Sequence, residues 1–412
     1  MLGIGDGGRQ TVTVAARTHS FPDRLPRWTT PVLLLAGAAV WLLRGWSRIA
    51  HPTLWAEDAT EFVAGAYQHP VHALIEPYAG YLHAVPRLIA LVASPLPLTW
   101  LPTVYALAAA AGAVAVAGLT LSARLRWLLP HRWQPPLAFA LLILLPGMDE
   151  PYANIANLIF FTGLALVLLG LCDDPATRAG RVTELAALVP LVLTGPFAIL
   201  ALPVFCARWW RLRGVHPVRA IAIVTAGAAV QLVILLVNDR RTGTFRLADI
   251  PRFIGHNILE TWLRGDRPGA RPTWLAVAAV VWLVAFLVVA WRLKLMGAAL
   301  IATVLIGVVA ILHAHGYVAV TPYRAQRHLL APLAIIVVVS VAGLADRLAW
   351  RRAVAALCLV AGLGGIVADF AIRPQPYRPI GPLADCLAAG HHPKCRAPVN
   401  PRGWFLILSP KR

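Results

Sequence analysis

The sequence predicts an all-α polytopic membrane protein with about eleven transmembrane helices. Hydrophobic residues make up 59% of the 412 residues and charged residues only 13%, whereas a soluble domain carries roughly 25% charged residues. The mean hydropathy is +0.69, and apolar stretches recur along almost the whole chain. These observations exclude a soluble fold, because so much apolar surface has to face lipid or other apolar helices.

The charge balance is strongly basic, with 37 Lys and Arg residues against 18 Asp and Glu residues and a net charge of +19. Such a balance can indicate nucleic-acid binding. Here the arginines stand at the ends of apolar stretches, where retention in the cytoplasm and contact with lipid phosphates account for them. We therefore expect membrane lipids as partners and no nucleic acid.

The N-terminal segment is expected to lie in the cytoplasm. Residues 1–30 are polar and contain arginine, and they lack the short apolar core and cleavage site of a signal peptide. The first span runs from Pro31 to about Ala50, and Arg24 and Arg27 precede it. The positive-inside rule therefore predicts that residues 1–30 form a cytoplasmic leader.

Residues 51–97 form the expected first extracytoplasmic loop. They are too polar for a span and too apolar for a solvated loop, and this mixture favours amphipathic helices that lie along the outer membrane surface. The pattern Asp58-Ala-Thr-Glu61 resembles a capping box, which would begin one of these helices.

The remaining apolar stretches complete a single membrane unit over residues 31–370, followed by an extracytoplasmic tail at 371–412. A span needs about 20 apolar residues, and basic clusters mark its cytoplasmic end. Thr194-Gly195-Pro196 divides one stretch into a hairpin of two short helices. In chain order, we expect these spans at 98–123, 135–147, 152–171, 182–207 (the hairpin), 219–237, 274–291, 296–313, 329–345 and 353–370.

Residues 238–273 form a second expected extracytoplasmic loop, which is rich in arginine. This opposes the positive-inside rule, although the rule weakens for long loops. Either the topology differs here, or these arginines have an anionic partner outside, such as a lipid carrier or an anionic glycan.

The few cysteines divide into two groups. Cys172, Cys206 and Cys358 lie in or at the ends of apolar segments, where inert thiols are expected. Cys386 and Cys395 bracket a short polar stretch of the tail. If the tail is extracytoplasmic, a disulfide between Cys386 and Cys395 is expected.

Two adjacent pairs of carboxylates carry the strongest functional signal. Glu57-Asp58 and Asp149-Glu150 follow the outer ends of the first and third spans. An ionisable group at a membrane boundary is costly unless it is hydrated, paired or functional. The structural alternatives are that Asp58 only caps a helix and that Asp149-Glu150 is a hydrated turn.

Two further stretches suit an anionic or polar ligand. Residues 77–87 combine aromatic rings and a glycine with His83 and Arg87, and anchoring at the membrane interface is the alternative role. Before the tenth span, Arg324 and Arg327 share one face of a helix and would clamp a phosphate. The alternative for these arginines is contact with ordinary lipid headgroups.

Several short motifs resemble the GT-C superfamily of membrane glycosyltransferases. Glu57-Asp58 is similar to the acidic motif in the first outer loop of these enzymes, and Arg327-His328 is similar to their Arg-Tyr dipeptide. The chain also resembles a group of uncharacterised bacterial integral membrane proteins. The motifs that carry this second likeness are Trp55-Ala56-Glu57-Asp58, Tyr78-x-Gly-Tyr-x-x-x-x-Pro86-Arg87, Asn154-Ile155-Ala156-Asn157-Leu158, Leu193-Thr194-Gly195-Pro196-Phe197 and Pro398-Val399-Asn400-Pro401-x-Gly403-Trp404.

The resemblance implies a GT-C-like fold in the bacterial inner (plasma) membrane. It also implies transfer of a sugar, with inversion, from a polyprenyl-phosphate donor to a cell-envelope glycan or glycolipid acceptor on the extracytoplasmic face. This reaction needs a carboxylate to accept the proton of the acceptor and cations to stabilise the leaving phosphate. The implied roles are catalysis by Asp58 or else Glu57, positioning of the acceptor or of a divalent cation (Mg²⁺ or Mn²⁺) by Asp149, Glu150, Tyr81, His83 and Arg87, and donor phosphate binding by Arg324, Arg327 and His328.

Other functions remain open from the residues alone. A transporter or flippase of polyprenyl-linked glycans would place ionisable residues near the midplane and show related halves, and neither feature is visible in the sequence. A glycan polymerase would use the outer arginines without needing the acidic pair. His69-x-x-His72 and His313-x-His315 have spacings that suit zinc, but the metalloprotease pattern His-Glu-x-x-His is absent.

Overall fold

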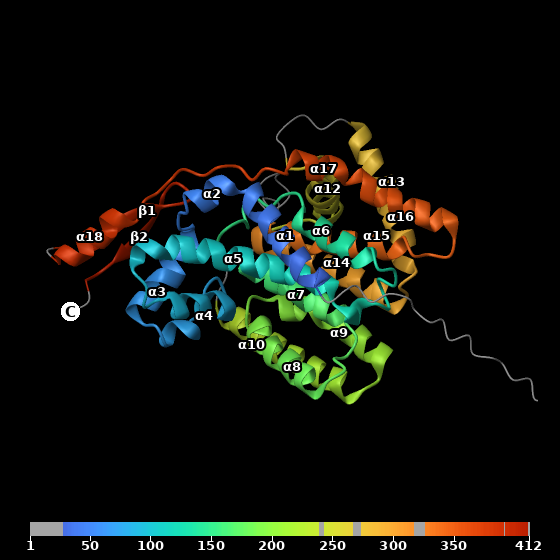
Figure 1. The fold of residues 1–412 in the computed structure, drawn as a ribbon, viewed down its shortest axis with the longest axis horizontal. Coiled ribbons are helices and arrows are strands. Elements are labelled where there is room, and N and C mark those ends of the chain that lie inside the picture. Colours follow the sequence, from blue (N-terminus) through green and yellow to red (C-terminus); the bar gives the residue numbers. More distant parts are fainter. Residues whose placement is uncertain (1–27, 239–242, 267–272, 317–325, 391, 411–412) are drawn as a thin grey trace, which may run out of the picture.

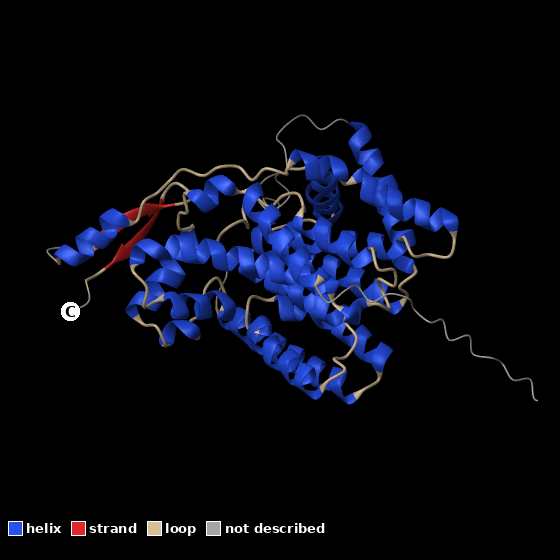
Figure 2. Cartoon of the chain, in the orientation of Figure 1, coloured by secondary structure: helices blue, strands red, loops and turns tan. Residues whose placement is uncertain are grey.

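The computed structural model describes residues 28–238, 243–266, 273–316, 326–390 and 392–410. These residues are mostly helical, and one small two-stranded sheet lies in the tail (Figures 1 and 2). Most of the expected leader, residues 1–27, lies outside the described residues. The elements of the first half of the chain are α1 (Thr29–Arg44), α2 (Trp46–Ala50), η1 (Asp58–Val63), α3 (Ala64–Gln68), η2 (His72–Leu74), α4 (Ala84–Ala93), η3 (Leu98–Trp100), α5 (Leu101–Gly118), η4 (Leu119–Leu121), η5 (Ala123–Leu125), α6 (Gln134–Ile143), α7 (Leu158–Leu171), α8 (Arg178–Val192) and α9 (Phe197–Leu212).

The second half of the chain continues with long helices and ends in the tail. Its elements are α10 (Val215–Val237), α11 (Asp249–Phe253), η6 (Ile254–Leu259), α12 (Glu260–Arg264), α13 (Thr273–Trp291), α14 (Leu295–His315), η8 (Gln326–Leu329), α15 (Leu330–Gly343), α16 (Ala349–Ala361), α17 (Leu363–Ala368), α18 (Gly381–Ala389), β1 (Cys395–Val399) and β2 (Trp404–Leu408).

Five helical stretches in the described part of the chain are long and apolar enough to cross a membrane. Further apolar helices of 10–17 residues accompany them. The chain therefore has the helices of a membrane protein, while the number of about eleven spans stays a prediction. The five long stretches are Leu98–Leu121, Val215–Val237, Leu295–His315, Gln326–Gly343 and Ala349–Ala368.

Helix α7 forms the centre of the helical assembly. All of its residues are buried, and it packs against α5, α8, α9 and α15. Two glycines allow α9 to approach closely, because a Cβ at Gly163 would lie 2.4 Å from the ring of Phe197 and one at Gly170 would lie 2.7 Å from Val204. Small residues of this kind are how transmembrane helices reach close packing in lipid.

A network of ion pairs lies at the C-terminal end of α7. Arg208, whose side chain is fully buried, pairs with Glu184 at 2.7 Å and with Asp174 at 3.0 Å. Arg211 pairs with Asp173 at 2.6 Å. Since α7 has 14 residues and a helix rises 1.5 Å per residue, this network lies about 20 Å from the N-terminal end of α7.

The first loop contains short helices (η1, α3, η2 and α4), but the expected capping box is not formed. Residue Asp58 is the first residue of η1, after the N-cap residue Glu57. Its carboxylate accepts a hydrogen bond from the backbone N–H of Ala156, far along the chain, at 2.8 Å. The side chain of Asp58 therefore connects η1 to the segment before α7 and does not cap its own helix.

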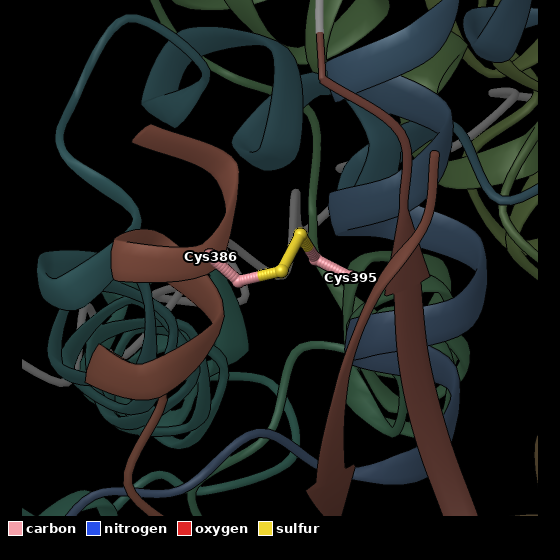
Figure 3. Close-up of a disulfide and its surroundings, with 2 residues drawn as sticks. All are labelled: Cys386 and Cys395. Atoms are coloured by element: carbon pink, nitrogen blue, oxygen red, sulfur yellow. A yellow bond between two sulfur atoms is a disulfide. The ribbon is translucent and has the colours of Figure 1, made fainter. Parts of the chain in front are cut away.

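The expectation of an all-α protein is wrong for the tail. There, β1 and β2 pair antiparallel, with Cys395 opposite Leu408 and Val399 opposite Trp404. Burial along β1 alternates from residue to residue, which is the period of a strand with one buried face. A disulfide joins Cys386 of α18 to Cys395 of β1 (Figure 3).

The second predicted loop is largely helical where the structure describes it. Residues 249–264 form α11, η6 and α12. Two of its arginines pair with acids of the same helical stretch, Arg252 with Asp249 at 3.4 Å and Arg264 with Glu260. These local partners account for part of the charge that the sequence left unexplained. Arg240, Arg241, Arg267 and Arg271 lie outside the described residues.

Candidate functional site

A cavity of about 290 Å³ lies among α7, α9, α14, α15 and the first loop. Its volume is close to the lower end of the range for small-molecule sites, roughly 300 Å³ and above. Three helix ends meet at its polar end, because Asn157 precedes α7, His315 ends α14 and Arg327 precedes α15. The polar residues of the lining are Glu57, Tyr78, Tyr81, His83, Asn157, Thr303, His315, Arg327 and His328.

The rest of the cavity is a mainly apolar shaft, in which Thr303 is a polar lining residue. Along α7 its lining residues are Ile159, Phe160, Gly163 and Val167, which lie on one face because they are spaced by about one helical turn. Residues Val304, Val308 and Ile311 line the shaft from α14, and Ile335 from α15. From residue 157 to residue 167 the helix rises about 15 Å. The cavity therefore suits a molecule with a polar head and an apolar chain.

Glu57 is the carboxylate that faces the cavity. Its side chain is half-buried, and it lines the polar end beside Tyr78 and Tyr81. Its Oε2 atom is buried and has no hydrogen-bond partner among the described residues. A buried acceptor without a partner is costly, so this oxygen is available to a bound hydroxyl group.

Asp58 does not line the cavity and is only 1% exposed. Burial raises its pKa to about 8, opposed chiefly by the hydrogen bond from the Ala156 N–H. Consecutive residues of a helix point in different directions, which is why two neighbouring carboxylates have such different surroundings. The structure therefore places Glu57, and not Asp58, at the cavity.

Arg327 supplies the cation at the polar end. Its guanidinium group forms an ion pair with Glu150 at 3.1 Å and lies over the ring of Phe160, 5.9 Å from the centroid. Its backbone N–H also donates to Glu150 at 3.3 Å, and its buried Nε has no hydrogen-bond partner among the described residues. Burial raises the pKa of Glu150, and the charge of Arg327 opposes that rise. Glu150 is therefore placed to orient Arg327.

Asn154 and Asn157 organise the turn that carries Glu150. Both side-chain amides donate to the backbone oxygen of Glu150, at 2.9 and 3.1 Å. The Asn157 N–H donates in turn to the side chain of Asn154 at 2.9 Å. Asn157 was absent from the residues predicted for the site, although the spacing of the two asparagines before an apolar run was visible in the sequence.

A tight turn presents Tyr78 and Tyr81 side by side at the cavity. The two residues exchange backbone hydrogen bonds at 3.0 and 3.2 Å, and the residues between them, Ala79 and Gly80, have φ of 55° and 84°. A positive φ is strained for alanine, and such strain persists where the surroundings enforce it. Tyr81 stacks on His83 with ring centroids 4.7 Å apart.

Tyr78 lines the cavity and interacts electrostatically with both the acid and the cation of the site. Burial, followed by the charges of Glu57 and Glu61, raises its pKa to about 12, and the charge of Arg327 opposes this rise. The hydroxyl group of Tyr78 therefore stays protonated and can donate to a ligand. Tyr78 belonged to the predicted aromatic stretch, but it was not singled out there as a site residue.

Besides Asp58, three further predicted site residues lie elsewhere or cannot be placed. Asp149 pairs with Arg373 at 3.1 Å and with Arg48 at 3.8 Å, away from the cavity lining. Arg87 is buried, and its guanidinium group lies over Phe62. Arg324 lies outside the described residues, so the predicted phosphate clamp is represented here by Arg327.

His328 joins Arg327 at the polar end. Its ring meets Phe160 edge-on with centroids 5.0 Å apart and lies 5.5 Å from the ring of His315. Among the residues that the structure describes, no group of three or more His, Cys, Asp or Glu side chains is arranged to hold a metal ion. A divalent cation at this site stays a prediction from the resemblance.

Comparisons with protein-family models, with curated proteins and with solved structures find no match for this chain. A function therefore has to be inferred from the residues that meet at the cavity. These are a carboxylate with a free oxygen, a partly paired arginine, two tyrosines and an apolar shaft.

Proposed function

We propose that this chain is a GT-C-like membrane glycosyltransferase. It would move a sugar from a polyprenyl-phosphate donor to an envelope glycan or glycolipid acceptor on the extracytoplasmic face, with inversion. One observation carries the proposal, namely that Glu57 and Arg327 line the polar end of a single cavity whose remainder is mainly apolar. A polyprenyl-phosphate sugar has the same division into a charged head and an apolar chain.

In the proposed reaction, Glu57 acts as general base. The acceptor hydroxyl oxygen forms a bond to the anomeric carbon, its proton passes to Glu57, and the bond from that carbon to the phosphate oxygen breaks. Polyprenyl phosphate leaves with the bonding electron pair, and Arg327 stabilises its added charge. The unpaired Oε2 of Glu57 supports its role, because no donor among the described residues competes with the acceptor for that atom.

The pairing of Arg327 with Glu150 suits a site that binds and releases phosphate. Without a donor, Glu150 neutralises the arginine at 3.1 Å, so that no isolated cation is buried. A bound phosphate would share the guanidinium group, whose Nε has no partner among the described residues. Glu150 is thus proposed to position Arg327, and Tyr81 and His83 to contact the acceptor or the transferred sugar.

The tail supports the proposed orientation in the inner (plasma) membrane, with the N-terminus in the cytoplasm and the C-terminus outside. Disulfides persist in oxidising compartments and are rare in the cytosol, and the tail carries the Cys386–Cys395 disulfide. Strand β2 packs against η1, which follows Glu57 directly. In the proposed orientation, the polar end of the cavity and the tail are therefore on the same side of the membrane.

A transporter, flippase or polymerase of polyprenyl-linked glycans is the second candidate function. It would use the same apolar shaft and the same arginine for the lipid phosphate. Neither transport nor recognition of the lipid requires a carboxylate with a free oxygen at the polar end. The enzyme is therefore preferred, because Glu57 provides that carboxylate.

The decisive experiment combines a strain that lacks the gene with two variants. Mass spectrometry of lipid-linked sugars should show accumulation of one polyprenyl-phosphate sugar in the deletion strain, and wild-type protein should reverse it. Glu57→Gln should fail to reverse it while retaining donor binding. The matched control is Glu76→Gln, because Glu76 is an exposed glutamate of the same loop. Full activity of Glu57→Gln would reject the proposed reaction.

A further inference from the structure

The side chain of Asn400, which follows β1 in the tail, is buried and contacts the first loop. It is 2% exposed, and its amide donates to Thr53 Oγ1 at 2.8 Å and to the backbone oxygen of Pro376 at 2.9 Å. Its backbone N–H donates to the backbone oxygen of Leu54 at 3.1 Å, and it forms a bridge with Trp55. All three contacts in the first loop fall directly before Glu57.

The backbone between these contacts and Glu57 leaves little freedom. Leu54 is 2% exposed, and the Ala59 N–H donates to the backbone oxygen of Trp55 at 3.0 Å. Glu57 lies only three residues after Leu54, a distance of about 10 Å even for extended chain. Because Oε2 of Glu57 has no hydrogen-bond partner of its own among the described residues, the backbone has to set the direction of its side chain.

The segment that carries Asn400 is itself held firmly. Residue Asn400 follows β1 directly, and β1 and β2 pair over five positions. The disulfide of Figure 3 joins this hairpin to α18, whose Leu383 is fully buried. Strand β2 packs against η1 and α3 of the first loop. We call α18, β1 and β2 (residues 381–408) the brace.

We propose that Asn400 is a positioning residue for Glu57 and that the brace, closed by its disulfide, holds the acidic segment in the geometry needed for transfer. This inference rests on the proposed role of Glu57 as general base. A displacement of a catalytic group by about 1 Å can lower a rate by about 100-fold. The described residues of the brace do not line the cavity, so loss of the brace should affect turnover and leave donor binding unchanged.

The test compares variants on both sides of the contact. Asn400→Ala should lower kcat by about 10- to 100-fold with an unchanged KM for the donor. Thr53→Ala should lower kcat by a smaller factor, and Thr53→Ser should restore it because serine keeps the acceptor oxygen. The matched control is Asn238→Ala, since Asn238 is an exposed asparagine at the end of α10. A change in donor KM with an unchanged kcat would contradict the positioning role.

Opening the disulfide probes the same brace without touching Asn400. A dithiol reductant supplies two electrons and two protons, converts the disulfide to two thiols and is itself oxidised to a cyclic disulfide. Reduction of the wild-type protein, or the variant Cys386→Ser, should lower kcat in the same way. The Cys386→Ser variant should then be insensitive to the reductant.

Hydrogen–deuterium exchange provides a readout that does not depend on activity. Residues 53–63 should exchange several-fold faster in Asn400→Ala and after reduction, while the helix Arg178–Val192 should exchange at the wild-type rate. Faster exchange in a protein that has no transferase activity even as wild type would uphold the brace and reject the proposed function. Unchanged exchange of residues 53–63 in both Asn400→Ala and Thr53→Ala would overturn the brace, whatever the activity.

Discussion

Replacement of Asp58 by asparagine should separate the roles of the two neighbouring carboxylates. Asparagine keeps the oxygen that accepts the hydrogen bond from Ala156, at 2.8 Å in the wild type, and it removes the ionisable group. Because Asp58 does not line the cavity, Asp58→Asn should keep transferase activity to within about tenfold. Loss of the general base in Glu57→Gln should lower kcat by about 100- to 10,000-fold.

The same replacement should remove a pH dependence of stability. The pKa of Asp58 is raised to about 8, against about 4 in an unfolded chain. A raised carboxyl pKa stabilises the fold fully below about pH 4, and this stabilisation is lost as the pH rises to about 8. Each pH unit in that window corresponds to about 1.4 kcal/mol, so between about pH 5 and about pH 8 the wild type should lose up to about 4 kcal/mol.

Thermal unfolding in detergent, followed by tryptophan fluorescence, measures this difference. The unfolding temperature of the wild type should fall by several degrees between about pH 5 and about pH 8. The temperature of Asp58→Asn should fall by less, and the gap between the two proteins should stop widening above about pH 8. The reasoning is refuted if both proteins show the same slope, or if Asp58→Asn is as inactive as Glu57→Gln.

Three further predictions concern the polar end of the cavity and the carboxylates near it. Arg327→Ala should weaken donor binding by about 10- to 100-fold, and Arg327→Lys should restore it only in part. Titration with a polyprenyl phosphate measures this binding. Equal binding by the wild type and both variants would contradict the role of Arg327 in binding phosphate. Ala79→Val should lower activity, because a β-branched residue is disfavoured at the φ of 55°. Ala79→Gly should stay active. Full activity of Ala79→Val would show that the turn is dispensable. Burial, followed by the charge of Asp369, raises the pKa of Asp266 to about 7. Asp369→Asn should lower that pKa, so the loss of stability between about pH 4 and about pH 7 should become smaller than in the wild type. An unchanged dependence of stability on pH would contradict the coupling.

The membrane character of the chain follows from composition, but the number of spans does not. Helix α14 is a mainly apolar helix of 21 residues, which is long enough to cross the hydrocarbon core. Helices such as α6 and α7 have 10 and 14 residues, and length alone does not decide whether these cross. The ends of these shorter helices depend on packing within the protein, and a hydropathy pattern carries no information about that packing.

Sequence reasoning grouped Glu57 with Arg327, but it favoured Asp58 over Glu57 as the base, whereas Glu57 is the one that lines the cavity. The grouping depended only on which side of the membrane each segment occupies, and the structure brings both residues to one cavity. The choice between neighbours depends on contacts with Ala156 and Asn400, which lie far along the chain. No local pattern encodes such contacts, since they form only when the segment before α7 and the tail are packed against the first loop.

The carboxylates at the two ends of α7 differ in whether they are paired with a cation or donor. At the C-terminal end, the buried carboxylate of Glu184 and the partly exposed carboxylates of Asp173 and Asp174 each pair with an arginine. Pairing is what a buried charge requires. At the N-terminal end, Glu57 keeps an oxygen without a partner among the described residues. The fold therefore has the means to pair its carboxylates. An unpaired one persists beside the cavity, which is where a ligand would provide the missing donor.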